Sequence, residues 1–257
     1  MSRERDVWFR RFQALNRAHT GVEAGCELVC FPHAGGSAAY WRGIALELAP
    51  DVDVLAVQYP GRLDRLGEAP VEDMHLLADL VAEALGPPGD RPRALLGHSM
   101  GASLAYEVAV RLARLPGGEP HLLVVSGRRA PSAAHGRKRE RPRDDAELIG
   151  RMRELGGTQA ALLDDPEMLE LILPVLRGDY RALDTYEDTP GRLLTCPVVA
   201  LTGDRDAEAP VKDVQGWRDH TSGEFRTHVF GGGHFYLNDH AGEVTELVRG
   251  LLPTRAG

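Results

Sequence analysis

The stretch Gly97-His98-Ser99-Met100-Gly101 decides the fold of this chain. Its G-x-S-x-G pattern is typical of a sharp turn between a buried strand and a helix, which raises one serine hydroxyl above a parallel sheet. The pattern alone is weak, but its flanks supply the context. An apolar run at 94–96 predicts a buried strand, and apolar residues recur at helical spacing over 102–112. Strand, turn and helix come in the required order, so Ser99 is the candidate nucleophile.

A second glycine-containing turn, Pro32-His33-Ala34-Gly35-Gly36, follows an apolar strand at 28–31. A serine that attacks a carbonyl carbon needs two preorganised N–H donors for the oxyanion that forms. In this arrangement one donor is the residue after the serine, Met100, and the other lies in the loop after an early strand. We select Ala34 as that second donor. A plain glycine turn is the alternative, and a phosphate loop would need a lysine and a hydroxyl that are absent here.

The base and the acid are sought after the serine, because the expected chain order is serine, acid, histidine. His234 follows three consecutive glycines, which would let an imidazole reach over the strand ends, and His240 is the competitor. The apolar strand predicted at 197–203 delivers two carboxylates. Asp206 is preferred because the later position clears the strand end, and Asp204 remains the alternative.

The apolar strands alternate with helical patterns, which indicates an α/β fold with a mostly parallel central sheet flanked by helices. We expect a single α/β-hydrolase domain over 1–257. About 65 residues without a strand-like run separate the last two apolar strands, too many for a simple crossover. They predict a helical lid inserted at 129–190, with helices at 144–155 and from 166 onwards. The second helix is apolar on most sides, so it is either a core helix or one wall of an acyl channel.

Composition narrows the class of protein. The net charge of −8 argues against a nucleic-acid binder, and no apolar run approaches the roughly 18 residues of a membrane span. The cysteines, Cys26, Cys30 and Cys196, lack metal-type spacing and are expected to be reduced core residues. With no signal peptide evident, we expect a cytoplasmic protein, and a monomer.

With these residues in place, the chain resembles the type II thioesterases that accompany polyketide and nonribosomal peptide synthetases. The specific marks, besides the two turns above, are Gln58-Tyr59-Pro60-Gly61-Arg62, Thr202-Gly203-Asp204-Arg205-Asp206 and Gly233-His234-Phe235-Tyr236-Leu237. The resemblance implies editing: hydrolysis of stalled or aberrant acyl groups from the phosphopantetheine thiol of acyl or peptidyl carrier proteins through an acyl-serine. It implies no metal and no bound cofactor, because the phosphopantetheine arm belongs to the substrate.

A basic segment fits such a partner. Between 128 and 143 the chain has seven basic residues and one acid. Carrier domains are usually acidic, so basic side chains at a lid entrance would steer association. The candidate docking residues are Arg128, Arg129, Arg137, Lys138 and Arg139, and the alternative is a solvated loop balanced by the acids that follow.

Other functions remain open from the sequence. A general carboxylesterase would share the serine, histidine and acid. A product-releasing thioesterase would share them too, and a non-catalytic binding protein of the same fold is a third alternative.

Overall fold

The computed structural model describes residues 3–12, 24–87, 89–134, 144–156, 163–188 and 191–253. In these residues a seven-stranded sheet has the order β1-β3-β2-β4-β5-β6-β7, and only β1 runs antiparallel to its neighbour. The prediction of a mostly parallel α/β sheet is confirmed. The strands are β1 (Phe9–Arg10), β2 (Cys26–Phe31), β3 (Val52–Val57), β4 (Arg93–His98), β5 (Leu122–Ser126), β6 (Val198–Gly203) and β7 (Phe225–Phe230).

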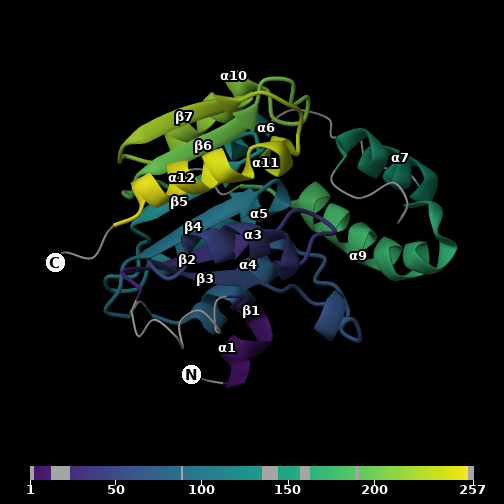
Figure 1. The fold of residues 1–257 in the computed structure, drawn as a ribbon, viewed down its shortest axis with the longest axis horizontal. Coiled ribbons are helices and arrows are strands. Elements are labelled where there is room, and N and C mark those ends of the chain that lie inside the picture. Colours follow the sequence, from purple (N-terminus) through teal and green to yellow (C-terminus); the bar gives the residue numbers. More distant parts are fainter. Residues whose placement is uncertain are drawn as a thin grey trace.

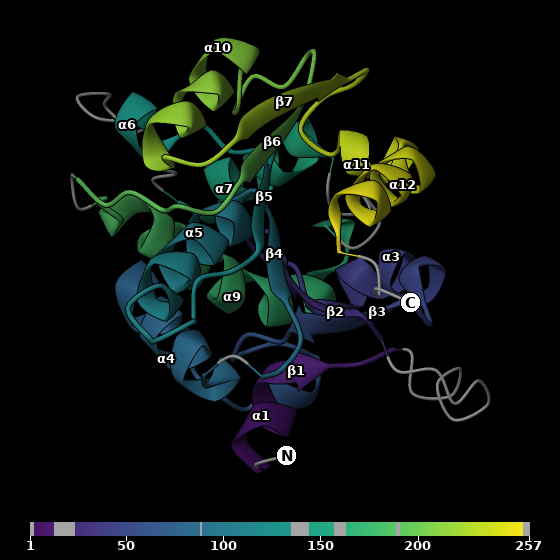
Figure 2. The same cartoon turned by 90° about the vertical axis from the view of Figure 1, so that its left-hand side faces the viewer.

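Helices cover both faces of the sheet (Figure 1, Figure 2). Every residue of β2 to β6 is buried, which explains why these strands are almost continuously apolar. One face carries α4 (Met74–Leu85) and α5 (Met100–Leu112), and the other carries α3 (Arg42–Leu48) and α12 (Ala241–Leu251). The short elements are α1 (Arg3–Trp8), α6 (Pro131–Ala134), α10 (Val211–Val214), α11 (Tyr236–Asp239) and the 3-10 turns Ala38–Trp41, Leu63–Arg65 and Gln215–His220.

Two longer helices stand between β5 and β6, where the sequence predicts an insertion. They are α7 (Asp145–Leu155) and α9 (Pro166–Thr185), and they lie together on one side of the molecule (Figure 1). Asp144 caps α7 by accepting from the Glu147 N–H at 2.9 Å. Apolar residues of the first half of α9 pack with α7, and its second half packs against the domain. Thus α9 is buried mainly along its second half, and its roles as a lid and as one wall of an acyl channel stay predictions.

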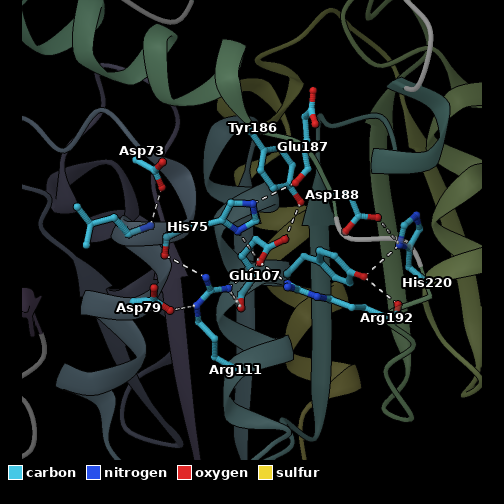
Figure 3. Close-up of polar contacts among 12 residues, drawn as sticks. Asp73, His75, Asp79, Glu107, Arg111, Tyr186, Glu187, Asp188, Arg192 and His220 are labelled. Atoms are coloured by element: carbon cyan, nitrogen blue, oxygen red, sulfur yellow. Dashed lines mark hydrogen bonds and ion pairs between the residues drawn. The ribbon is translucent and has the colours of Figure 1, made fainter.

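The chain that leaves α9 is attached to the domain through a buried carboxylate, Glu107 of α5 (Figure 3). Glu107 accepts from the Tyr186 hydroxyl at 3.0 Å, from Arg192 at 3.0 Å and from Arg111 at 2.6 Å. His75 of α4 adds a contact to Glu107 at 3.3 Å and another to the Glu187 carbonyl at 3.0 Å. The segment that leads from α9 to β6 is therefore held to the domain by Glu107.

Candidate active site

The serine turn forms where the sequence places it, between β4 and α5. Ser99 has φ 55° and ψ −117°, a conformation that costs a non-glycine residue energy and recurs at functional sites. Close packing surrounds it: a Cβ at Gly97 would lie 2.1 Å from the Gly101 oxygen, and one at Gly101 would lie 2.1 Å from the Phe31 oxygen. The two glycines are therefore steric requirements of the turn. The Ser99 N–H donates to the Ser126 carbonyl on β5 at 2.8 Å.

His234 and Asp206 meet this serine from two other loops. His234 Nε2 lies 2.9 Å from Ser99 Oγ, and His234 Nδ1 lies 2.9 Å from Asp206 Oδ2. The other oxygen of Asp206 accepts the N–H groups of Glu208 at 2.8 Å and Ala209 at 3.1 Å. Both His234 and Asp206 are buried. An ionised carboxylate only accepts, so His234 carries its proton on Nδ1 and presents a free Nε2 to Ser99.

The two competing residues point elsewhere. Asp204 accepts from the Gly232 N–H at 2.7 Å and helps to shape the glycine loop. His240 lies near the surface, where its ring contacts Glu243 at 2.7 Å and the Gly231 carbonyl at 2.9 Å. Neither of them contacts Ser99 or His234 among the described residues.

The two candidate oxyanion donors lie beside the serine. Met100 is the first residue of α5, where backbone N–H groups have no partner within the helix. Ala34 lies in the loop after β2, next to Gly35, whose φ of 76° turns the chain. The sheet register brings the ends of β2 and β4 together, since Phe31 pairs with Gly97. The loop and the serine turn are therefore neighbours.

Comparisons with known proteins identify the family of this chain. The thioesterase domain family matches residues 26–252. The chain belongs to this family. It is 46% identical over 251 residues to thioesterase PikA5 of Streptomyces venezuelae, covering 97% of this chain and 87% of that protein. It is 46% identical over 243 residues to a probable cadicidin biosynthesis thioesterase of Streptomyces griseus, covering 94% and 67%.

The similarity extends to solved structures. The type II thioesterase BorB from the borrelidin biosynthetic cluster superposes with a TM-score of 0.85 at 41% identity, covering 96% of this chain and 98% of that one. The resemblance to type II thioesterases is thereby confirmed, and the protein is a hydrolase acting on thioesters.

Two further histidines of the thioesterase, His33 and His98, lie near His234, and the expected chain order excluded both as the base. The His98 ring lies 5.2 Å from that of His234, while its Nδ1 contacts Ser126 Oγ at 2.9 Å. His33 stacks edge-on against Tyr40 at 4.6 Å between ring centres. Burial lowers the pKa of His33 to about 3 and holds the pKa of His98 well below its usual value, and the neighbouring His234 acts in the same direction. Both are neutral at neutral pH, so neither repels a proton arriving on His234.

The predicted docking residues are only partly described. Arg128 donates to Ser103 Oγ at 2.9 Å and Arg129 donates to the Glu208 carbonyl at 2.8 Å, so both are bound within the thioesterase. The remaining candidates, Arg137, Lys138 and Arg139, lie outside the described residues. In the described ranges there is no cluster of three or more potential metal ligands, and no helix is long and apolar enough to cross a membrane.

Proposed function

We propose that this protein is a free-standing type II thioesterase that hydrolyses stalled or aberrant acyl groups from the phosphopantetheine thiol of carrier proteins. The observation that supports this proposal most is that hydrogen bonds link Ser99 to His234 and His234 to Asp206 in a member of the thioesterase family. The similarity to PikA5 and BorB over most of their own lengths supports the free-standing form. The phosphopantetheine arm enters as part of the substrate, and the chain's own residues supply the chemistry.

In the proposed acylation step, Ser99 Oγ attacks the thioester carbonyl carbon while His234 Nε2 takes the hydroxyl proton. The oxyanion receives hydrogen bonds from the N–H groups of Ala34 and Met100. The C–S bond then breaks, and the leaving thiolate takes the proton back from His234. Asp206 holds the imidazole in the required tautomer and stabilises its positive charge.

Deacylation repeats these steps with water. His234 Nε2 takes a proton from the water molecule as its oxygen attacks the acyl-serine carbonyl, and the proton then returns to Ser99 Oγ as the ester bond breaks. The acid is released, and the serine is regenerated.

The test compares hydrolysis of an acetyl or propionyl group on a phosphopantetheinylated carrier protein with hydrolysis of the same group on a small thiol. The native protein should favour the carrier-bound substrate, and Ser99→Ala should lose roughly 10⁴-fold or more of kcat. Preference for small oxygen esters would instead indicate a carboxylesterase. An active Ser99→Ala variant would reject the proposed chemistry.

We also propose that the basic segment assists docking. Arg128 and Arg129 donate to groups of the domain, so substituting them would also remove these contacts, and the test uses Arg137, Lys138 and Arg139. Reversing the charge of these three side chains should slow hydrolysis of carrier-bound acyl groups at low salt and leave small-thioester hydrolysis unchanged. Equal effects on both substrates would contradict the docking role.

A further inference from the structure

The turn after β3, Gln58 to Arg62, holds the backbone of the loop that carries Ala34. The Tyr59 hydroxyl donates to the Pro32 carbonyl at 3.1 Å, and Arg62 Nε donates to the Gly36 carbonyl at 2.8 Å. Gln58 Oε1 accepts from the Ala38 N–H at 3.1 Å. All three of these side chains are buried. This turn is one of the marks of the family resemblance, yet the reaction steps above use none of its side chains.

Asp179 of α9 completes this set of contacts from the inserted helices. Its Oδ2 accepts from the Gly35 N–H at 2.7 Å and forms an ion pair with Arg62. Asp179 is 2% exposed and Arg62 is 5% exposed. The helix also packs closely here, since a Cβ at Gly35 would lie 2.6 Å from a methyl carbon of Leu176. A buried ion pair such as this one adds little net stability, because the cost of desolvating both charges offsets much of their Coulomb attraction.

These contacts fix the peptide units on both sides of the one that carries the Ala34 N–H. The preceding unit is held at the Pro32 carbonyl by Tyr59, and the following unit is held at the Gly35 N–H by Asp179. The middle unit itself is held at the His33 carbonyl, which accepts from the Gly36 N–H at 2.9 Å. The direction of the Ala34 N–H is therefore set by groups that take no part in the proposed reaction steps.

We propose that Asp179 is a positioning residue that aims the Ala34 N–H at the oxyanion, and that it makes this aim depend on the docking of α9. The inference rests on the proposed function, in which Ala34 is an oxyanion donor. When α9 is docked, Asp179 holds Gly35 and Arg62 together; when α9 moves away, Gly35 loses its acceptor and Arg62 loses its counter-charge. In this proposal an inserted helix controls transition-state stabilisation.

The test uses Asp179→Ala and Asp179→Asn, with Glu72→Ala as the matched control. Glu72 pairs with Arg181, which also joins α9 to the domain, but that pair is exposed and does not contact the loop. The readouts are kcat and KM for an acyl thioester, the inhibition constant of an alkyl trifluoromethyl ketone, and the melting temperature. The ketone forms a hemiketal with Ser99 whose oxyanion needs the same donors as the transition state.

Asp179→Ala should lower kcat by about 10- to 100-fold, since a small misplacement of a donor costs most of what the donor supplies. KM should stay within about twofold, and the inhibition constant should rise by the same factor as the fall in kcat/KM. Asp179→Asn keeps an oxygen acceptor for the Gly35 N–H but removes the charge that faces Arg62, so it should recover only part of the loss and leave kcat several-fold below native. Glu72→Ala should match the native protein within about twofold.

The proposal is overturned if Asp179→Ala acts through KM with kcat intact, or if Glu72→Ala is as damaging as Asp179→Ala. Should Asp179→Ala fail to fold, Asp179→Asn and Tyr59→Phe decide: a fall in kcat matched by weaker ketone binding supports the proposal, and unchanged kcat in both overturns it. Ser99→Ala, assayed alongside, separates the two claims. If it is active, the proposed function fails; if it is inactive while Asp179→Ala is unimpaired, only the positioning role fails.

Discussion

Asp206→Asn should abolish most of the activity by reversing the tautomer of His234. One oxygen of Asp206 accepts two backbone N–H groups, at 2.8 and 3.1 Å, and the other faces His234 Nδ1. An asparagine must keep its carbonyl oxygen on the two backbone donors, because its NH₂ group cannot accept from them. The NH₂ group is then directed at Nδ1, which must become an acceptor, and the imidazole proton moves to Nε2.

With its proton on Nε2, His234 cannot take the proton of Ser99. In serine proteases the corresponding change lowers kcat by about 10⁴-fold, or about 5 kcal/mol of transition-state stabilisation. We expect a loss of the same order here, because the backbone donors leave the asparagine only one favourable orientation. KM should change little, since Asp206 does not contact the acyl group in the proposed mechanism.

The assay combines steady-state thioester hydrolysis with ¹⁵N NMR of the His234 ring. The native spectrum should show the proton on Nδ1, and the spectrum of Asp206→Asn should show it on Nε2. Asp204→Asn is the matched control, because its amide oxygen can still accept from the Gly232 N–H, so it should keep activity within about twofold. A kcat within tenfold of native for Asp206→Asn, or a proton retained on Nδ1, would refute the tautomer argument.

Three further predictions concern stability. Gly101→Ala places a Cβ 2.1 Å from a backbone oxygen and should lower the free energy of unfolding by at least about 3 kcal/mol. Gly150→Ala in α7 meets nothing within 4 Å and should raise the free energy of unfolding by up to about 1 kcal/mol. Similar melting temperatures for the two variants would contradict this prediction. Burial depresses the pKa of His33 and His98, so both gain protons on unfolding as the pH falls below about 6.5. The free energy of unfolding should therefore drop by about 2–3 kcal/mol from pH 7 to pH 5.5, and His33→Phe should remove half of that dependence in thermal melts. Glu107→Ala leaves Arg111, Arg192 and the Tyr186 hydroxyl without their shared acceptor and should lower the free energy of unfolding by about 2–3 kcal/mol. Glu107→Gln should lower it by less, and denaturant titration measures both.

The chemistry of the site could be placed from the sequence because its main signals are local. A buried strand, a turn crowded enough to require glycine, and a helix each leave a pattern in neighbouring residues, so Ser99 and the loop around Ala34 could be identified. Strand positions were also predictable: the strands expected at 28–31 and 197–203 are β2, Cys26–Phe31, and β6, Val198–Gly203, in the structure. The strand predicted at 94–96 was too short, because β4 spans Arg93–His98 and its two polar ends are buried as well.

The direction in which a side chain points, and its partner when that partner is far away in the sequence, were decided only by the tertiary structure. Asp204 and Asp206 follow the same strand two residues apart. The sequence preferred Asp206 for its later position but left Asp204 open, and only the structure shows that the Asp206 carboxylate faces a histidine 28 residues later. Asp179 lies on an amphipathic helix and looks in the sequence like any surface acid, yet it is buried against Gly35, 144 residues earlier. Composition and spacing indicate which chemical groups a segment contains, whereas the partner of each group depends on how loops and helices pack. The sequence by itself therefore determined the chemistry available to this thioesterase, and the packing of α9 and of the loops at the strand ends decided which side chains are held in place to use it.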